Sequence, residues 1–175
     1  SSSNWNDWRK PKMYFYPNYG TQTGYLSNVD VPDVADICGT KYSIGILTKD
    51  GKWLTMGRNN YYNLGHQSST SSGSKFRSPW SEEGGTTNNK GHGSDTFTKI
   101  TCQQHYTTYS GHCALRNDGK LFCTGSNGYG QLGQGNTDSD IKTAVQVKIP
   151  TEVVDVECGG DLCRAIDING DVWVW

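Results

Sequence analysis

Residues 118–133 read Asp-Gly-Lys-Leu-Phe-Cys-Thr-Gly-Ser-Asn-Gly-Tyr-Gly-Gln-Leu-Gly, and this stretch decides the fold. It opens with the turn signal Asp118-Gly119, and the run from Lys120 to Thr124 favours a β-strand. A second short run, residues 112–115, precedes the turn. Two such runs joined by Asp-Gly predict a β-hairpin.

The same arrangement occurs at two other places in the chain. Asp50-Gly51 lies between runs 43–47 and 52–57, and Asn169-Gly170 lies between runs 163–166 and 171–175. Asp-Gly and Asn-Gly favour type I′ turns, in which both central residues have positive φ. Three equivalent hairpins predict a repeated unit of several short strands, which is typical of a propeller blade.

Other residues recur at fixed distances from these turns. Glycine follows the turn glycine by six residues, and a Leu-Gly pair comes seven residues after that, in the first two units. A cysteine precedes each hairpin. The recurring residues are Gly57 and Gly125, Leu64-Gly65 and Leu132-Gly133, and Cys38, Cys102 and Cys158.

The stretch 118–133 resembles the RCC1 repeat. That family's pattern is a Cys-Gly step, a strand ending in Asp-Gly, a second strand ending in Trp-Gly, and Asn-x-x-Gly-Gln-Leu-Gly. Met56 and Thr124 stand at the tryptophan position, and residues 59–65 match the last element weakly. Family members typically close seven blades. The resemblance therefore implies an all-β, RCC1-like β-propeller with about three readable blades, as a fragment of a larger closed propeller.

The repeats suggest a division of the chain into five segments. A Ser-, Gly- and Thr-rich stretch without periodicity interrupts them and predicts an insertion loop. The expected segments are an N-terminal segment with a remnant of a preceding blade at 1–28, a blade at 29–65, the insertion loop at 66–95, a blade at 96–144, and the start of a further blade at 145–175.

Composition argues against several classes of function. The 175 residues carry a formal net charge of −1, without the basic excess that nucleic-acid binders use, so no nucleic-acid partner is expected. No apolar run approaches the length of a membrane-spanning helix, so no membrane insertion is expected. Nucleophile-elbow, phosphate-loop and HExxH motifs are absent from the sequence. We therefore expect no enzyme, no catalytic residues and no cofactor.

The six cysteines allow three interpretations. Cys38, Cys102 and Cys158 precede equivalent hairpins, which favours small buried side chains selected for packing. Disulfides Cys102–Cys113 and Cys158–Cys163 are an alternative that spacing alone cannot establish. The residue types for zinc are present in Cys102-x-x-His105 and His112-Cys113, but the spacing of two separated ligand pairs is poor, so no metal site is expected.

These observations favour a binding or structural module that contacts protein or glycan. Aromatic side chains provide contact area at low conformational cost, and we expect partner contacts at Tyr61, Tyr62, Trp80, Tyr106 and Tyr109. The abundance of Asn, Gly, Ser, Thr and Tyr favours an extracellular or phage-virion component, such as a tail, fibre or decoration protein in a large assembly, over a cytoplasmic or nuclear one. The alternative, implied by the resemblance, is a guanine-nucleotide exchange regulator or an intracellular interaction scaffold.

Overall fold

The computed structural model describes residues 33–67, 73–79, 95–104, 110–139 and 141–175. Residues 33–175 form one compact unit. The expected N-terminal segment 1–28 and the expected contacts Trp80, Tyr106 and Tyr109 lie outside the described residues.

The described part of the chain forms eleven strands. They are β1 (Val34–Gly39), β2 (Ser43–Thr48), β3 (Trp53–Gly57), β4 (Gly73–Arg77), β5 (Phe97–Gln104), β6 (Ser110–Arg116), β7 (Leu121–Gly125), β8 (Val145–Gln146), β9 (Val153–Gly159), β10 (Leu162–Asp167) and β11 (Val172–Val174).

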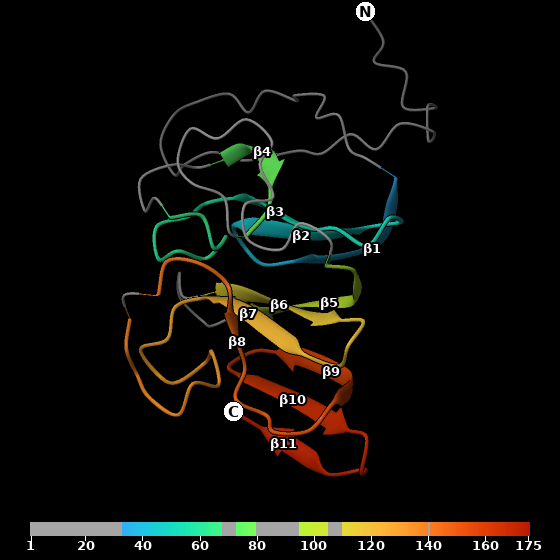
Figure 1. Ribbon diagram of the computed structural model, residues 1–175. Helices are drawn as coiled ribbons and strands as arrows, with labels where there is room; N and C mark the ends of the chain where they lie inside the picture. The colour runs from blue at the N-terminus through green and yellow to red at the C-terminus, as the bar shows by residue number, and fades with distance from the viewer. Residues whose placement is uncertain (1–32, 68–72, 80–94, 105–109, 140) are drawn as a thin grey trace, which may run out of the picture. The chain divides into compact units, whose positions relative to one another are not determined.

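The strands form three antiparallel sheets that follow one another in space (Figure 1). Blade 1 has the order β1-β2-β3-β4, blade 2 the order β5-β6-β7-β8, and blade 3 the order β9-β10-β11. Each sheet is a meander, because every strand pairs with the next strand in sequence. The fold is an all-β run of propeller blades, as the repeats predicted.

Two details differ from the predicted segments. Strand β4 lies inside the stretch 66–95 that was interpreted as a loop, and it pairs with β3 as the outer strand of blade 1. Strand β8 pairs with β7, so the sheet of blade 2 extends beyond residue 144. The interpretation of 66–95 as loop throughout is therefore wrong. The sequence did not indicate this strand, because Gly-Ser-Lys-Phe-Arg lacks the alternation of apolar and polar residues by which strands are recognised.

The three predicted hairpins are present, with a different turn type. Among the turn residues only the glycines have positive φ, at 81° for Gly51, 76° for Gly119 and 86° for Gly170. The amide of Gly51 donates to the carbonyl of Thr48, and the amide of Thr48 donates to the carbonyl of Lys52. This geometry is a three-residue loop that ends in a left-handed glycine, so the expectation of type I′ turns is wrong.

The hydrophobic core lies between the blades, because successive side chains of a strand point to opposite faces of its sheet. Leu121 and Cys123 pack toward blade 3, in a cluster with Val153 and Val156. Phe122, between them in sequence, packs toward blade 1. There it joins Phe97, whose ring lies 5.6 Å from that of Trp53 in an edge-on arrangement. Blade 2 thus contributes to both interfaces, through the two faces of its sheet.

All six cysteines form disulfides, namely Cys38–Cys102, Cys113–Cys123 and Cys158–Cys163. The alternative pair Cys158–Cys163 is present, whereas Cys102–Cys113 is wrong. The interpretation of Cys38, Cys102 and Cys158 as packing residues is also wrong, since each is bonded. Cys102 cannot serve the zinc arrangement as a thiolate in this state, and His105 lies outside the described residues.

Within the described ranges, no helix is long and apolar enough to cross a bilayer.

Candidate binding site

The blades have two structurally different ends. The hairpin turns that carry Gly51, Gly119 and Gly170 lie at one end, on the right in Figure 1. The loops that follow β3 and β7 lie at the other end, since each of these strands runs away from its turn. We call the surface formed by residues 58–67 and 126–139 the loop face.

A buried asparagine shapes the loop in both blades. The side-chain oxygen of Asn59 accepts a hydrogen bond from the amide of Leu64 at 2.9 Å. Asn127 stands 68 residues later and accepts in the same way from the amide of Leu132 at 3.0 Å. Both asparagines are fully buried, so the repeated Asn-to-Leu spacing holds the two loops in the same conformation.

Tyr62 occupies a backbone position that normally suits glycine. Its φ is 56°, and among the described residues it alone has positive φ without being glycine. The residue 68 positions later is Gly130, with φ of 85°. A tyrosine in the left-handed region is costly, and such residues concentrate at functional sites.

Exposed tyrosines stand at equivalent points on the loop face. Tyr61 is 40% exposed, and Tyr129, 68 residues later, is 73% exposed. The amide of Tyr129 donates to the side chain of Gln131 at 2.8 Å, so the loop beneath it is ordered. Tyrosine combines large contact area with a polar hydroxyl, which makes this pair suited to recognition of another macromolecule.

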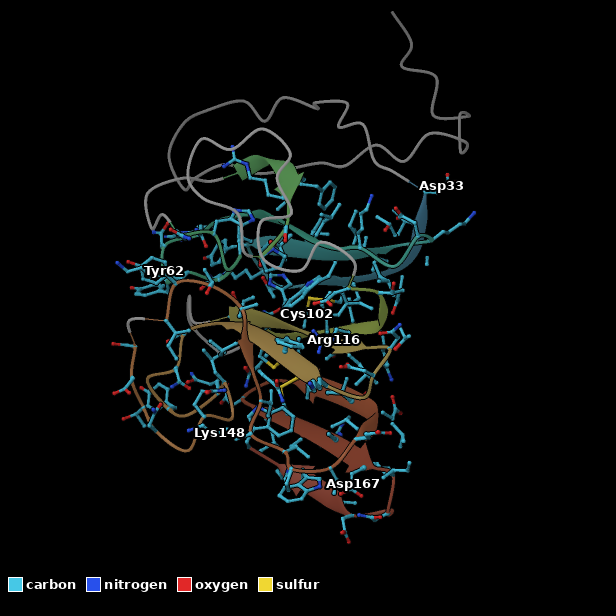
Figure 2. All side chains as sticks on the ribbon, in the orientation of Figure 1. Asp33, Tyr62, Cys102, Arg116, Lys148 and Asp167 are labelled. Atoms are coloured by element: carbon cyan, nitrogen blue, oxygen red, sulfur yellow. A yellow bond between two sulfur atoms is a disulfide. The ribbon has the colours of Figure 1, made fainter. Side chains whose placement is uncertain are left out.

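Basic side chains surround the aromatic rings at this end of blade 1. Nζ of Lys142 lies 5.8 Å from the ring centre of Tyr62. Figure 2 labels Tyr62 on its left side, in the loop that follows β3. Lys41 and Arg58 each lie 5.1 Å from the ring centre of Tyr42, in the β1–β2 turn at the same end. Cation–π contacts of this kind hold both charges and rings at the surface.

A buried polar network supports the loop face from below. Nδ1 of His112 lies 3.0 Å from the carbonyl oxygen of Asn63, and its Nε2 lies 3.3 Å from the hydroxyl of Ser43. The hydroxyl of Thr124 donates to the same Asn63 carbonyl at 2.7 Å. Burial lowers the pKa of His112 to about 4, although the hydrogen bond to Asn63 opposes this. A neutral imidazole therefore ties blade 2 to the loop of blade 1.

Of the predicted contact residues that the structure describes, Tyr61 and Tyr62 both lie on the loop face, as neighbours in one turn. The predicted hairpin residues Asp50, Gly51, Asp118, Gly119, Asn169 and Gly170 lie at the opposite end. Tyr129 was missed. The 68-residue repeat offset from Tyr61 would have identified it.

Comparison with known proteins points to one family. The model of the regulator of chromosome condensation (RCC1) repeat matches residues 118–166. Protein RCC2 homolog of Danio rerio is 29% identical over 86% of this chain and 27% of its own length. RCC1 domain-containing protein RUG3, mitochondrial, of Arabidopsis thaliana is 27% identical over 91% of this chain and 33% of its own length.

Solved structures show the same fold at low identity. Human WBSCR16 covers 89% of this chain and 36% of its own, with a TM-score of 0.67 and 16% identity. Yeast RCC1 (Prp20), in a crystal structure with Kap60, covers 83% of this chain and 32% of its own, with a TM-score of 0.62 and 16% identity. The chain spans about a third of the length of these relatives. Residues 118–166 thus match an RCC1 repeat, and the fold of the chain is that of RCC1-like β-propeller blades.

Proposed function

We propose that this chain is a non-enzymatic part of a propeller that binds another protein through its loop face. The observation that carries the proposal is the pair of repeat-equivalent exposed tyrosines, Tyr61 and Tyr129, on loops fixed by buried asparagines. Recognition surfaces commonly consist of aromatic side chains on loops that a rigid scaffold positions.

Solved relatives support a protein as the partner. Yeast RCC1 was crystallised with Kap60, and a second structure of Prp20p from Saccharomyces cerevisiae was described together with its binding to Gsp1p and histones. Histone binding suits a chromatin protein, whereas this chain has a net charge of −1. We therefore propose a protein partner outside chromatin. Binding to a glycan in place of a protein would contradict this proposal.

The disulfides support a location at a cell surface or in a virion. Three disulfides connect all six cysteines. Disulfides persist in oxidising compartments and are rare where thioredoxin and glutathione keep thiols reduced. This is independent of the composition, which favours the same environment.

Thiol labelling tests the compartment. Cells or particles from the natural source are treated with an alkylating reagent before lysis, and the cysteine peptides are then mapped without reduction. Three intact disulfides with no labelled cysteine are the expected result. Labelling of all six cysteines in this experiment would overturn the surface assignment.

The second candidate is a guanine-nucleotide exchange regulator. It is favoured by the similarity to yeast RCC1, because Prp20p binds Gsp1p. The intact natural protein is mixed with small GTPases from the same source that carry a fluorescent GDP, and nucleotide release is followed. Unchanged release is expected, and an acceleration would favour the regulator over the surface module.

A further inference from the structure

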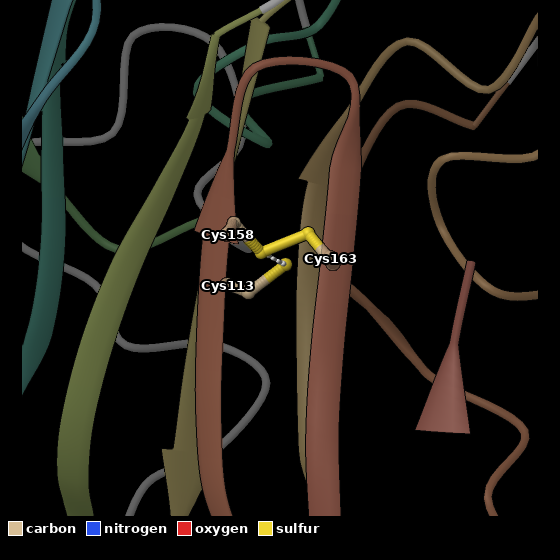
Figure 3. A group of neighbouring side chains, drawn as sticks. All are labelled: Cys113, Cys158 and Cys163. Atoms are coloured by element: carbon tan, nitrogen blue, oxygen red, sulfur yellow. Dashed lines mark hydrogen bonds between the residues drawn. A yellow bond between two sulfur atoms is a disulfide. The ribbon is translucent and has the colours of Figure 1, made fainter. Parts of the chain in front are cut away.

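Two disulfides lie against each other at the interface between blades 2 and 3. Figure 3 shows Cys113 of one beside the Cys158–Cys163 disulfide. Cys113 and Cys123 stand directly opposite each other on β6 and β7. Cys158 and Cys163 stand opposite each other on β9 and β10. Each disulfide thus joins two strands of one blade, and no disulfide in the described structure joins blade 2 to blade 3.

The sulfur atoms of the two disulfides are in contact. Sγ of Cys158 lies 3.8 Å from Sγ of Cys113, and the three sulfurs of Cys113, Cys158 and Cys163 all lie within 4.8 Å of one another. Cys113, Cys123 and Cys163 are fully buried, whereas Cys158 is partly exposed. Among these four residues only Cys158 is partly exposed, so it lies nearest to a reductant in solution, although its sulfur is buried like those of Cys113 and Cys163.

A disulfide links blade 1 covalently to blade 2. It joins Cys38 of β1 to Cys102 of β5. By strand register Cys102 corresponds to Cys158, while Cys38 corresponds to Thr101. The hydroxyl of Thr101 accepts a hydrogen bond from the amide of Cys158 at 3.0 Å. At the interface between blades 2 and 3, the hydrogen bond between Thr101 and Cys158 therefore stands where the disulfide stands between blades 1 and 2. The cysteine of β5, Cys102, follows Thr101 by one residue.

We propose that the four cysteines form a disulfide-exchange site that converts the two disulfides within blades into one disulfide between blades 2 and 3. The co-reactant is a protein dithiol of the kind that acts in oxidising compartments, such as a protein disulfide isomerase. Its first thiolate attacks Sγ of Cys158, and the Cys158–Cys163 bond breaks, with Cys163 leaving as a thiolate that takes up a proton. Its second thiol then closes the reductant's own disulfide and releases Cys158 as a thiolate.

The released thiolate completes the exchange. Cys158 attacks Sγ of Cys113, the Cys113–Cys123 bond breaks, and Cys123 leaves as a thiolate that takes up a proton. The products are a Cys113–Cys158 disulfide, two thiols at Cys123 and Cys163, and one oxidised dithiol. The attacking sulfur of Cys158 and the attacked sulfur of Cys113 are already neighbours. Cys113 can therefore exchange its bond to Cys123 for a bond to Cys158 without separation of the blades.

The variant Cys163→Ser tests the exchange directly, because it creates the Cys158 thiol without any reductant. The purified full chain is held at about pH 8, where a thiol of ordinary pKa is partly ionised. It is then quenched with acid, alkylated, and digested with trypsin and chymotrypsin to separate Cys102 from Cys113. The expected major product is Cys113–Cys158, with Cys123 alkylated.

The matched control is Cys158→Ser, which removes the same disulfide and leaves a thiol at Cys163. It should retain Cys113–Cys123, with Cys163 alkylated only after unfolding. Circular dichroism on both variants shows whether each is folded. Retention of Cys113–Cys123 in folded Cys163→Ser would overturn the proposal, as would equal exchange in both variants. If Cys163→Ser does not fold, wild-type protein under limiting reduced protein disulfide isomerase must yield Cys113–Cys158, and its absence there would equally overturn it.

Discussion

The indole nitrogen of Trp175 donates a hydrogen bond to the backbone carbonyl of Gln131, at 2.9 Å across the interface between blades 2 and 3. The hydroxyl of Thr124 makes the equivalent bond to Asn63, between blades 1 and 2. Trp175 and Thr124 stand at the same position, five residues after the turn glycine. A threonine therefore replaces the tryptophan of the RCC1 pattern and keeps its hydrogen bond.

Thr124→Val should destabilise the protein by about 1 kcal/mol, because it removes a buried hydrogen bond with little change in shape. Thr124→Ser keeps the hydroxyl and should retain this interaction, at the smaller cost of one methyl group. Urea unfolding followed by tryptophan fluorescence measures both. A valine variant more stable than the serine variant would show that the hydroxyl does not couple the blades.

Gly119→Ala should destabilise the protein more than Gly170→Ala, by roughly 1–3 kcal/mol. Both substitutions place a β-carbon at positive φ. A β-carbon at residue 119 would lie 2.7 Å from the Cβ of Glu152 at the start of blade 3, whereas one at residue 170 meets nothing within 4 Å. Thermal melting compares the two variants, and equal melting temperatures would contradict the contact between turn and blade.

The stability of the protein should fall as the pH decreases from about 6.5 to 4. The pKa of His112 is about 4 in the folded protein and near 6.5 when unfolded, so only the unfolded state takes up the proton in this range. The contribution of His112 is therefore complete above pH 6.5 and is lost toward pH 4, by up to about 3 kcal/mol.

His66 titrates in the same range, because burial also lowers its pKa to about 4. His112→Gln should therefore reduce the pH dependence of the unfolding free energy without removing it. Urea unfolding at several pH values measures this dependence. The same slope in the variant as in the parent would contradict a buried neutral His112.

Asp167→Asn should destabilise blade 3 more than Asp171→Asn, which makes the same charge change at an exposed site of the same turn. The Asp167 carboxylate accepts from the hydroxyl of Thr151, the amides of Asn169 and Asp171, and the indole of Trp173. The hydroxyl of Thr151 and the indole of Trp173 lower the pKa of Asp167 to about 2.

The sign of the acid effect follows from that lowered pKa. The contribution of Asp167 is present above an unfolded pKa near 4 and is lost as the pH falls toward 2. Acid unfolding followed by near-ultraviolet circular dichroism should show this loss in the parent and not in Asp167→Asn. An acid transition that is unchanged in the variant would assign the effect to other carboxylates.

The sequence predicted the blades because each hairpin needs a glycine at positive φ, and Gly51, Gly119 and Gly170 mark all three. It did not predict the partners of the cysteines. Cys38 follows Ile37 directly, whereas Cys102 and Cys158 each come two residues after the equivalent apolar residue. One position along a strand changes the face of the sheet, so Cys38 faces blade 2 and bonds to Cys102.

The candidate site was only partly visible in the sequence. Tyr61 and Tyr62 stood out as aromatic residues, but their exposure depends on how the loop closes over Asn59. The left-handed conformation of Tyr62 has no sequence signal, because glycine is the residue expected there. Tyr129 required the repeat offset to be applied to side chains as well as to turns.

Site-specific photocrosslinking tests the loop face most directly. A benzoylphenylalanine is placed at Tyr61 or Tyr129, and at Lys49 or Asn117 as exposed, repeat-equivalent controls in the hairpin turns at the other end of the blades. Each variant is mixed with material from the natural source and irradiated, and the crosslinked protein is identified by mass spectrometry. One protein captured from positions 61 and 129, and not from 49 and 117, is the predicted result. Equal capture from both ends, or capture only at the turns, would contradict the assignment of the loop face.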